Sequence, residues 1–230
     1  DTSNPKYRLD PPPSSRIEAL ESEYNLDSTN LDYSQKEAII LALSSNCPIS
    51  LIHGPPGTGK TTTVANLIRC AVRCLGWKVL VTAPSNVAVD NVLERMMQIE
   101  ENDSKRSNKR RANKLSKSKI KAVRLGHPAR IQHGIQKYSL ESLVQASDGT
   151  EIVRDCRNEM NDHLRTLSNP KSRPSEKRVA YREMKSLRKE IRSREEKVVG
   201  QILRESNVVL ATNVGASSSV LNRMVDSRGD

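Results

Sequence analysis

The chain has 230 residues, with 38 Lys or Arg against 27 Asp or Glu, so its formal net charge at pH 7 is +11. This length allows one well-buried core with an appendage, and the basic excess favours an acidic polymer as partner. Because no apolar run approaches the ~20 residues of a membrane span and the polar start is unlike a signal peptide, we expect no membrane contact and a cytoplasmic or nuclear location.

The first predicted helix follows a tail. Residues 1–30 show little organisation and contain the proline run 11–13, which indicates an extended linker to an upstream region. Residues 31–43 have apolar side chains at helical spacing after a capping residue, Asp32 or Ser34. Gln35 lies in the first turn of this helix, where its amide is either a plain surface group or a group that faces a nucleotide base.

A phosphate-loop pattern comes next. The apolar run from Ile49 to Ile52 predicts a buried strand, and residues 61–74 predict a helix. Between them the chain fits G-x-x-x-x-G-K-[ST], in which glycines let successive backbone N–H groups face one anion. A plain turn is the alternative, but these fixed positions in this setting favour a nucleotide site. The residues assigned to it are Gly54, Pro55, Pro56, Gly57, Thr58, Gly59, Lys60, Thr61 and Thr62.

Two residues of this loop are expected to carry the chemistry. Lys60 is placed to reach the β- and γ-phosphates of a nucleotide, and the Thr61 hydroxyl is placed to hold Mg²⁺. The N-terminus of the following helix adds its positive end. The sequence therefore predicts a site for a nucleoside triphosphate and Mg²⁺, with Lys60 and Thr61 as the catalytic residues.

Strands and helices continue to alternate after the loop. Residues 77–83 predict a second strand, and residues 84–97 predict a helix that directs Val87, Val92 and Met96 inward. Further strands are predicted at residues 121–125 and 207–212. This alternation predicts an α/β fold with a parallel sheet, whose carboxyl edge receives ligands.

The basic excess is concentrated in one stretch. Between Ser104 and Arg124 there are ten Lys or Arg residues and no acid, so the rest of the chain is nearly balanced. The plain interpretation of residues 104–121 is a solvated loop. Such a loop would raise non-specific affinity for DNA or RNA in a salt-dependent way, and its Lys and Arg density is also typical of a nuclear-localisation signal.

Residues 139–206 change to a helical pattern and predict an inserted antiparallel hairpin. The pattern breaks between Asn169 and Pro174, and outward Arg and Lys are nearly balanced by Glu, which indicates a solvated surface. The apolar stripes predicted to pack together are Ile152, Val153, Cys156, Met160, Leu164 and Leu167 on one helix and Val179, Met184, Leu187, Ile191, Val198 and Ile202 on the other.

The cysteines form no zinc-finger spacing. Cys70 and Cys74 lie one helical turn apart, but no histidine pair accompanies them, so a metal site is disfavoured. Cys47 and Cys156 also sit in apolar or helical patterns. All four are expected to be buried or half-buried thiols in a reducing compartment.

Several motifs in order carry a family resemblance. Gln35 in L-D-Y-S-Q, the loop H-G-P-P-G-T-G-K-T-T-T and A-P-S-N-V-A-V-D-N from Ala83 to Asn91 together resemble the superfamily 1 helicases of the regulator-of-nonsense-transcripts type. The stretches R-L-G-H-P-A-R from Arg124 and V-V-L-A-T-N-V-G-A-S from Val208 are similar to the immunoglobulin-mu-binding-protein helicases.

The resemblance implies a RecA-like ATP-binding domain at residues 31–138 and 207–230, incomplete at its C-terminus, with the hairpin at 139–206 inserted into it. It implies ATP as the nucleotide, with Gln35 reading adenine, and single-stranded DNA or RNA as the partner of a monomeric protein. The residues that it assigns to the nucleic-acid backbone are Pro84, Ser85, Asn86, Thr212 and Asn213.

The family pattern also includes an Asp-Glu pair after an apolar strand and a second RecA-like domain, and neither is in this sequence. We therefore expect the intact protein to be an ATP-dependent helicase, 5′-to-3′ by resemblance, and this chain alone to hydrolyse ATP poorly. The alternatives are another P-loop NTPase, of the AAA+ or GTPase type, and a nucleic-acid-binding fragment that does not hydrolyse nucleotide. The motif from Ala83 to Asn91 disfavours AAA+, and the lack of N-K-x-D disfavours a GTPase.

Overall fold

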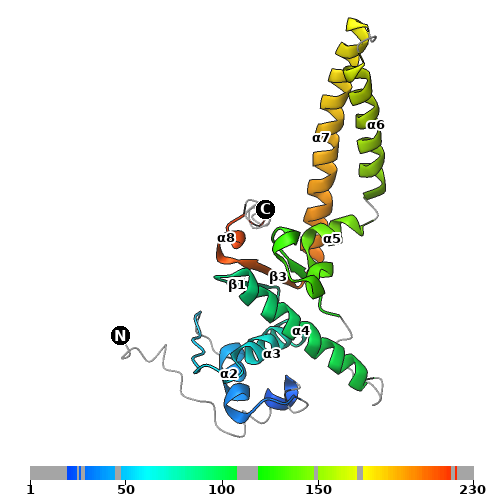
Figure 1. Cartoon of the computed structure of the whole chain (residues 1–230). Coiled ribbons are helices and arrows are strands. Elements are labelled where there is room, and N and C mark those ends of the chain that lie inside the picture. Colours follow the sequence, from blue (N-terminus) through cyan, green and yellow to red (C-terminus); the bar gives the residue numbers. More distant parts are fainter. Residues whose placement is uncertain are drawn as a thin grey trace. The chain divides into compact units, whose positions relative to one another are not determined.

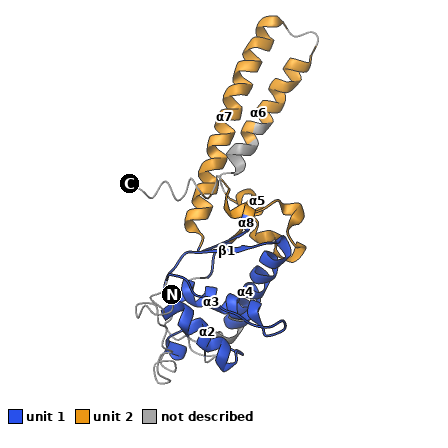
Figure 2. Ribbon diagram, turned by 90° about the vertical axis from the view of Figure 1, so that its left-hand side faces the viewer, with its two compact units in different colours: residues 1–122, 207–213 blue, residues 123–206, 214–230 orange. Residues whose placement is uncertain are grey.

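The computed structural model describes residues 20–24, 26, 29–44, 48–107, 119–147, 150–169, 173–218 and 221, without the side chains of residues 104–107, 150–154 and 157. Most of the predicted tail at residues 1–30 and of the basic run at residues 104–121 therefore lies outside the described residues. The chain divides into two compact units, residues 1–122 with 207–213 and residues 123–206 with 214–230, coloured separately in Figure 2.

A parallel sheet forms the centre of the first unit. Strand β1 (Val79–Ala83) pairs in parallel with β3 (Val208–Thr212), in a register that runs from Val79 opposite Val208 to Ala83 opposite Thr212. The described sheet has the order β1-β3-β2, where β2 is Ala122–Arg124. The strand that comes last in the chain is thus the central one, and the predicted α/β class with a parallel sheet is confirmed.

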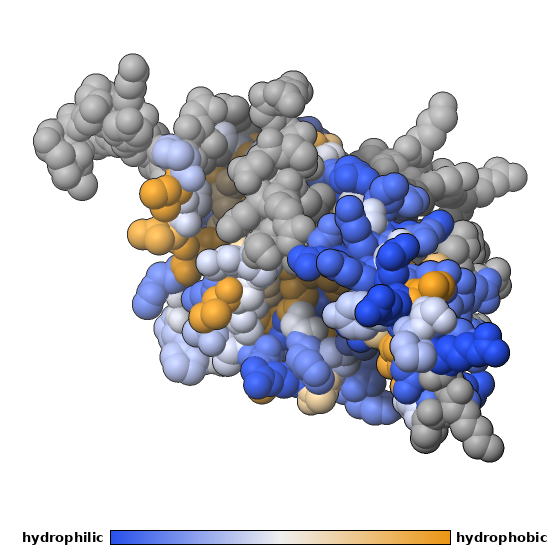
Figure 3. Space-filling model, turned by 90° about the horizontal axis from the view of Figure 1, so that it is seen from above, coloured by the Kyte–Doolittle hydropathy of each residue, from blue (hydrophilic) through white to orange (hydrophobic). Residues whose placement is uncertain are grey.

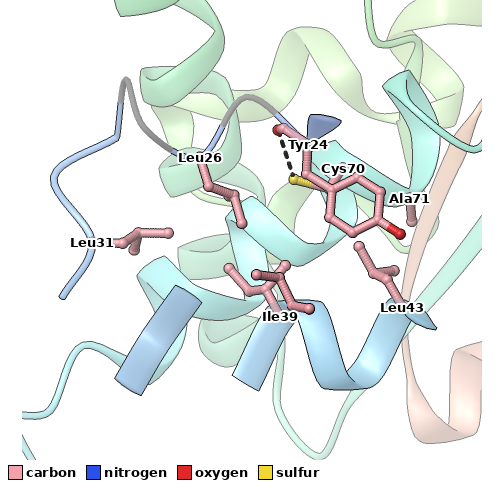
Figure 4. Close-up of a cluster of buried hydrophobic side chains, with 8 residues drawn as sticks. Tyr24, Leu26, Leu31, Ile39, Leu43, Cys70 and Ala71 are labelled. Atoms are coloured by element: carbon pink, nitrogen blue, oxygen red, sulfur yellow. Dashed lines mark hydrogen bonds between the residues drawn. The ribbon is translucent and has the colours of Figure 1, made fainter. Parts of the chain in front are cut away.

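Three helices accompany the sheet. Helix α3 (Lys60–Arg73) contacts both α2 (Tyr33–Ser44) and α4 (Asn86–Ser107), as Figure 1 shows. Between α2 and α3 lies a hydrophobic cluster, drawn in Figure 4, whose members include Tyr24 and Leu26. These two residues fall within the stretch that the sequence assigned to the tail. Burial of apolar surface therefore begins upstream of α2. The whole cluster is Tyr24, Leu26, Leu31, Ile39, Ile40, Leu43, Cys70 and Ala71.

Helix α4 differs from its prediction in two respects. It continues to Ser107 rather than ending near Met97, so residues 104–107 of the predicted basic loop are helical. Its buried stripe contains Val89, Leu93 and Met96, whereas Val87 is 67 % exposed, so the inward direction predicted for Val87 is wrong. Val87 lies in the first turn, and the i, i+4, i+7 stripe that packs on the sheet begins only at Val89.

The predicted strand before the phosphate loop is also wrong. The segment from Ile49 to Ile52 forms no strand, and Leu51 is 93 % exposed. A strand requires a neighbour that takes up its N–H and C=O groups, and no described strand pairs with this segment. An apolar run indicates that a segment suits a sheet, but it does not supply the partner.

The second unit contains short elements and two long helices. The short elements are 3₁₀ turns at Pro128–Arg130 and His133–Tyr138 and helix α5 (Leu140–Gln145). Helices α6 (Thr150–Ser168) and α7 (Pro174–Glu205) form the predicted hairpin. After β3 the chain enters the short helix α8 (Asn213–Ala216).

The hairpin interior is narrow. Cys156 on α6 and Ile191 on α7 form a small buried cluster with Leu187. Val179 and Leu164 are 51 % and 39 % exposed, so their predicted packing is wrong, and Ala180 is buried in place of Val179. The end-on view of Figure 3 shows a mostly hydrophilic hairpin surface with isolated hydrophobic side chains.

No helix in the described part of the chain is both long and apolar enough to cross a membrane.

Candidate nucleotide-binding site

The loop before α3 has the backbone conformation that its glycines permit. Gly57 and Gly59 have φ values of 81° and 75°, in the left-handed region that favours glycine. A Cβ atom on Gly54 would lie 2.8 Å from Thr58 Oγ1, and one on Gly59 would lie 2.7 Å from Gln35 Nε2. Side chains at these two positions would therefore disturb the loop, as the sequence predicted.

Helix α3 presents unbonded backbone donors to this loop. The N–H group of Thr63 donates to the carbonyl oxygen of Gly59, the residue just before the helix, at 3.0 Å. The N–H groups of Lys60, Thr61 and Thr62 precede it, and no described residue before the helix accepts from them. Free donors at the positive end of a helix dipole form an anion site.

The Lys60 side chain lies across the mouth of the loop. Its Nζ donates to Gly54 O at 2.8 Å and to Pro55 O at 2.7 Å. The loop is further tightened by Thr58, whose Oγ1 donates to Pro55 O at 2.8 Å. The ammonium group thus already points into the cradle, where phosphate oxygens would replace these two carbonyl oxygens as acceptors.

Gln35 connects the start of α2 to the same loop. Its backbone N–H donates to Asp32 Oδ1 at 2.9 Å, and its Oε1 accepts from Asp32 N at 3.2 Å, which is a reciprocal capping box. These contacts identify Asp32 as the cap, and hydrogen bonds from Gln35 N and Ser34 Oγ lower the pKa of its carboxyl. The Gln35 Nε2 donates to Thr58 O at 2.9 Å. Its amide therefore holds the loop, and Oε1 is already engaged.

The residues present fit Mg²⁺ only together with a nucleotide. The Thr61 side chain is exposed, and its hydroxyl bonds to no residue in the described part of the chain. Among the described residues, no group of three or more His, Cys, Asp or Glu side chains gathers to bind a metal ion. A hard cation here would need phosphate oxygens and water beside the Thr61 hydroxyl.

The segments predicted to contact a nucleic acid meet at one edge of the sheet. Because Ala83 is opposite Thr212 in adjacent parallel strands, Pro84 and Asn213 leave the same carboxyl edge. Ser85 caps α4, since its Oγ accepts from Ala88 N at 3.2 Å. This geometry is compatible with both capping and phosphate binding, because the cap uses only one donor of the helix start.

His127, considered in the sequence as a residue at the ligand edge, has a local role. Its Nδ1 accepts from Ala129 N at 3.2 Å and caps the 3₁₀ turn Pro128–Arg130. This is the turn role that a His next to Pro more often has.

Helices α3 and α4 are joined by ion pairs between side chains, which the sequence analysis did not predict. Arg69, 3 % exposed, pairs with Asp103, and Arg73 Nη2 lies 2.5 Å from Glu100 Oε2. Burial raises the pKa of Glu100 despite this partner. In the sequence, two arginines and two acids at one-turn spacing within separate helices were the available signal.

A second contact between these helices was also missed. Arg95 Nε on α4 donates to Thr62 Oγ1 on α3 at 3.1 Å. The two residues lie 33 positions apart, so no local pattern could have joined them.

The thiols of α3 differ from each other. Cys70 is buried and its Sγ lies 3.6 Å from Tyr24 O, whereas Cys74 ends the helix and is half-buried. A hydrogen bond from Cys70 lowers the pKa of Cys74 to about 7, and the same bond, with burial, raises the pKa of Cys70. Cys70, Cys74 and Cys156 are free thiols, and Cys47 lies outside the described residues.

The sequence is similar to a defined set of proteins. A family model described as an AAA domain (AAA_11) matches residues 30–228. DNA-binding protein SMUBP-2 of Mus musculus is 43% identical over 209 residues, which is 90% of this chain and 18% of the relative. DNA polymerase alpha-associated DNA helicase A of Schizosaccharomyces pombe is 36% identical over 191 residues, 83% of this chain and 26% of the relative.

A Regulator of nonsense transcripts 1 homolog of Drosophila melanogaster is 30% identical over 196 residues, 85% of this chain and 14% of the relative. The chain thus spans 18% of the length of the mouse relative and comparably small shares of the others.

Proposed function

This chain belongs to the superfamily 1 helicases of the regulator-of-nonsense-transcripts type, within the AAA domain family that matches residues 30–228, and on that premise we propose that it is the ATP-binding part of an ATP-dependent helicase. The observation that carries the proposal is the loop from Gly54 to Thr61. There, unbonded N–H groups of α3 and the Lys60 ammonium converge on one space.

The nucleotide proposed is ATP with Mg²⁺. Lys60 would bind the terminal phosphates, and the Thr61 hydroxyl would contribute one ligand to the metal, which neutralises phosphate charge when bound. Gln35 would read adenine after its amide rotates away from Asp32 N, because that donor holds Oε1 in the present arrangement. We propose that the remaining loop residues, Pro55, Pro56, Gly57, Thr58 and Thr62, shape the cradle.

The nucleic acid proposed is single-stranded DNA or RNA. Pro84, Ser85, Asn86, Thr212 and Asn213 would hold its phosphodiester backbone, and their shared sheet edge supports a common track. We propose that the intact protein is a monomer that moves 5′-to-3′ on this strand in the nucleus, the cytoplasm or both. Residues 139–206 would be an accessory insertion in a RecA-like domain at residues 31–138 and 207–230.

A binding experiment tests the nucleotide site. We expect the 230-residue chain to bind a fluorescent ATP analogue, ATP to compete better than GTP, and Lys60→Ala to weaken binding about tenfold to a hundredfold, as loss of charge-assisted hydrogen bonds of ~1.5–3 kcal/mol implies. Lys78→Ala is the matched control, because Lys78 precedes β1 and is not part of the loop. Equal competition by GTP would contradict the ATP assignment, and unchanged binding by Lys60→Ala would contradict the site.

The second candidate function is a nucleic-acid binder without hydrolysis, favoured by the ten basic residues between Ser104 and Arg124. Anisotropy of a labelled single strand separates the two. A helicase domain should change its affinity for the strand when ATP is added, and Lys60→Ala should abolish that response. A charge-driven binder should ignore ATP and lose affinity steeply with salt.

A further inference from the structure

Arg95 stands beside the candidate phosphate cradle, and none of the assignments above includes it. Its Nε donates to Thr62 Oγ1 at 3.1 Å, and its Nη1 donates to Gln98 Oε1 at 3.3 Å on its own helix. Two hydrogen bonds in different directions fix the plane of the guanidinium group. The side chain is nonetheless exposed. Arg95 is therefore held in place without being buried.

The residue that Arg95 contacts belongs to the anion site. Thr62 is in the first turn of α3, and no described residue before the helix accepts a hydrogen bond from its backbone N–H group. The Thr62 hydroxyl accepts from Arg95, and a hydroxyl also has one hydrogen to donate. Within the described part of the chain, that hydrogen has no acceptor. The contact thus brings a fixed positive charge to the rim of the cradle.

Arg95 has donors left for an anion. A guanidinium carries five N–H groups, and the hydrogen bonds to Thr62 and Gln98 use two of them. Among the described residues, no carboxylate forms an ion pair with Arg95, in contrast to the buried Arg69 and the half-buried Arg73 on the neighbouring helix. Unused planar donors beside unbonded backbone N–H groups suit phosphate oxygens.

Resting on the proposed function, we propose that Arg95 is a further nucleotide-binding residue, whose guanidinium donates directly to the phosphate chain of the bound nucleotide. The class of ligand is a nucleoside diphosphate or triphosphate. The guanidinium belongs to α4, the helix that begins at Asn86, so a bound phosphate chain would contact both α3 and α4.

Nucleotide titrations of the 230-residue chain test this. Arg95→Ala should weaken both ADP and ATP by about tenfold to a hundredfold, the range for one charge-assisted hydrogen bond. Arg95→Lys should restore part of the affinity, and Arg95→Met, which keeps the aliphatic stem, should not. Arg165→Ala on α6 is the matched control, since Arg165 is also an exposed helical arginine with a hydrogen bond one turn away. It should bind as the unaltered chain does.

Two outcomes would overturn the proposal. If Arg95→Ala binds ADP and ATP with unchanged affinity, the Arg95–Thr62 contact only holds α3 and α4 together and does not bind nucleotide. If Arg95→Ala has no further effect in a Thr62→Val background, Arg95 acts only by positioning the hydroxyl, and direct contact is excluded. Unfolding midpoints without nucleotide should be the same for all Arg95 variants, because an exposed side chain contributes little to folding. Failure of the unaltered chain to bind ATP would instead contradict the proposed function itself and, with it, this inference.

Discussion

Two helix pairs in this chain are held together in different ways. Helices α3 and α4 join through buried and half-buried ion pairs, and α3 packs against a hydrophobic cluster while α4 packs against the sheet. Helices α6 and α7 join through a small cluster around Ile191, and exposed ion pairs such as Arg192–Glu196 lie within one helix of the hairpin. Buried charge is costly to leave unpaired, whereas exposed ion pairs contribute little.

This difference matches what each pair is proposed to do. The starts of α3 and α4 present the phosphate cradle and the Pro84–Asn86 segment, and a site of this kind needs donors held at fixed positions. The hairpin carries no residue that we assign to the chemistry. The spacing between its helices therefore does not position any of the donors assigned to the proposed site.

The largest expected effect is on the buried ions. Asp103→Ala should reduce the free energy of unfolding of the first unit by about 3–5 kcal/mol, because it leaves the Arg69 guanidinium buried without its carboxylate. The single tryptophan, Trp77, reports this unit in a fluorescence-monitored urea titration. Asp162→Ala on α6, whose exposed pair with Arg165 serves as the control, should change stability by less than about 0.5 kcal/mol. Equal effects of the two would show that the buried pair between α3 and α4 stabilises no more than an exposed pair within one helix.

Truncating a buried apolar side chain should also reduce the free energy of unfolding more in the α3–α4 pair than in the hairpin. Leu93 on α4 is fully buried, and Leu93→Ala should cost about 3–5 kcal/mol. Ile191→Ala in the thin hairpin cluster should cost about 2 kcal/mol, since fewer neighbours surround the cavity that it leaves. Circular dichroism follows all the helices and tryptophan fluorescence follows the first unit, so a dichroism transition without a fluorescence change reports the hairpin. A larger loss for Ile191→Ala than for Leu93→Ala would reverse the comparison.

Replacing a glycine with alanine should lower the free energy of unfolding in the loop before α3 and raise it in α7. Gly59→Ala should destabilise by about 2 kcal/mol, because φ is 75° there and the new Cβ would displace Gln35. Gly57→Ala meets no atom within 4 Å and should show only the backbone cost of about 1 kcal/mol. Gly200→Ala inside α7 should stabilise by about 0.5–1 kcal/mol. In a Gln35→Ala background, Gly59→Ala and Gly57→Ala should converge, and a persistent difference would refute the Gln35 contact.

The smallest effect concerns thiol reactivity, which leaves folding nearly unchanged. Because the pKa of Cys74 is lowered to about 7, its thiolate fraction rises with pH, and alkylation by iodoacetamide should reach half its maximal rate near pH 7. Cys156, buried in the hairpin, should react only on unfolding. Cys70→Ala removes the donor that lowers the pKa and should move the midpoint upward, whereas Cys70→Ser keeps a donor and should move it less. Mass spectrometry of the modified peptides measures each rate.

Much of the candidate site was readable from sequence because it depends on contacts between near neighbours. The glycines of the loop, the cap of α2 and the start of α3 are local features, and the structure places them as expected. The alternation of strands and helices predicted a parallel sheet, but only the structure shows that β1 and β3 are neighbours in it.

The remainder was decided by tertiary contacts. Ile49 to Ile52 satisfied the pattern of a strand but found no described partner, and Val87 and Val179 matched an apolar stripe yet face solvent. Periodicity states which faces of an element are apolar, not which neighbour arrives to cover them. The Arg69–Asp103 pair and the Arg95–Thr62 contact join residues more than 30 positions apart.

The sequence by itself thus determined the glycine-rich loop before α3 and the α/β class, because bond rotations at glycine and the period of side chains are properties of short segments. Only the tertiary structure decided which charges lie together on α3 and α4 and which apolar residues are covered. Those outcomes depend on the packing of distant segments, where burial changes the energy of every charge and every methyl group.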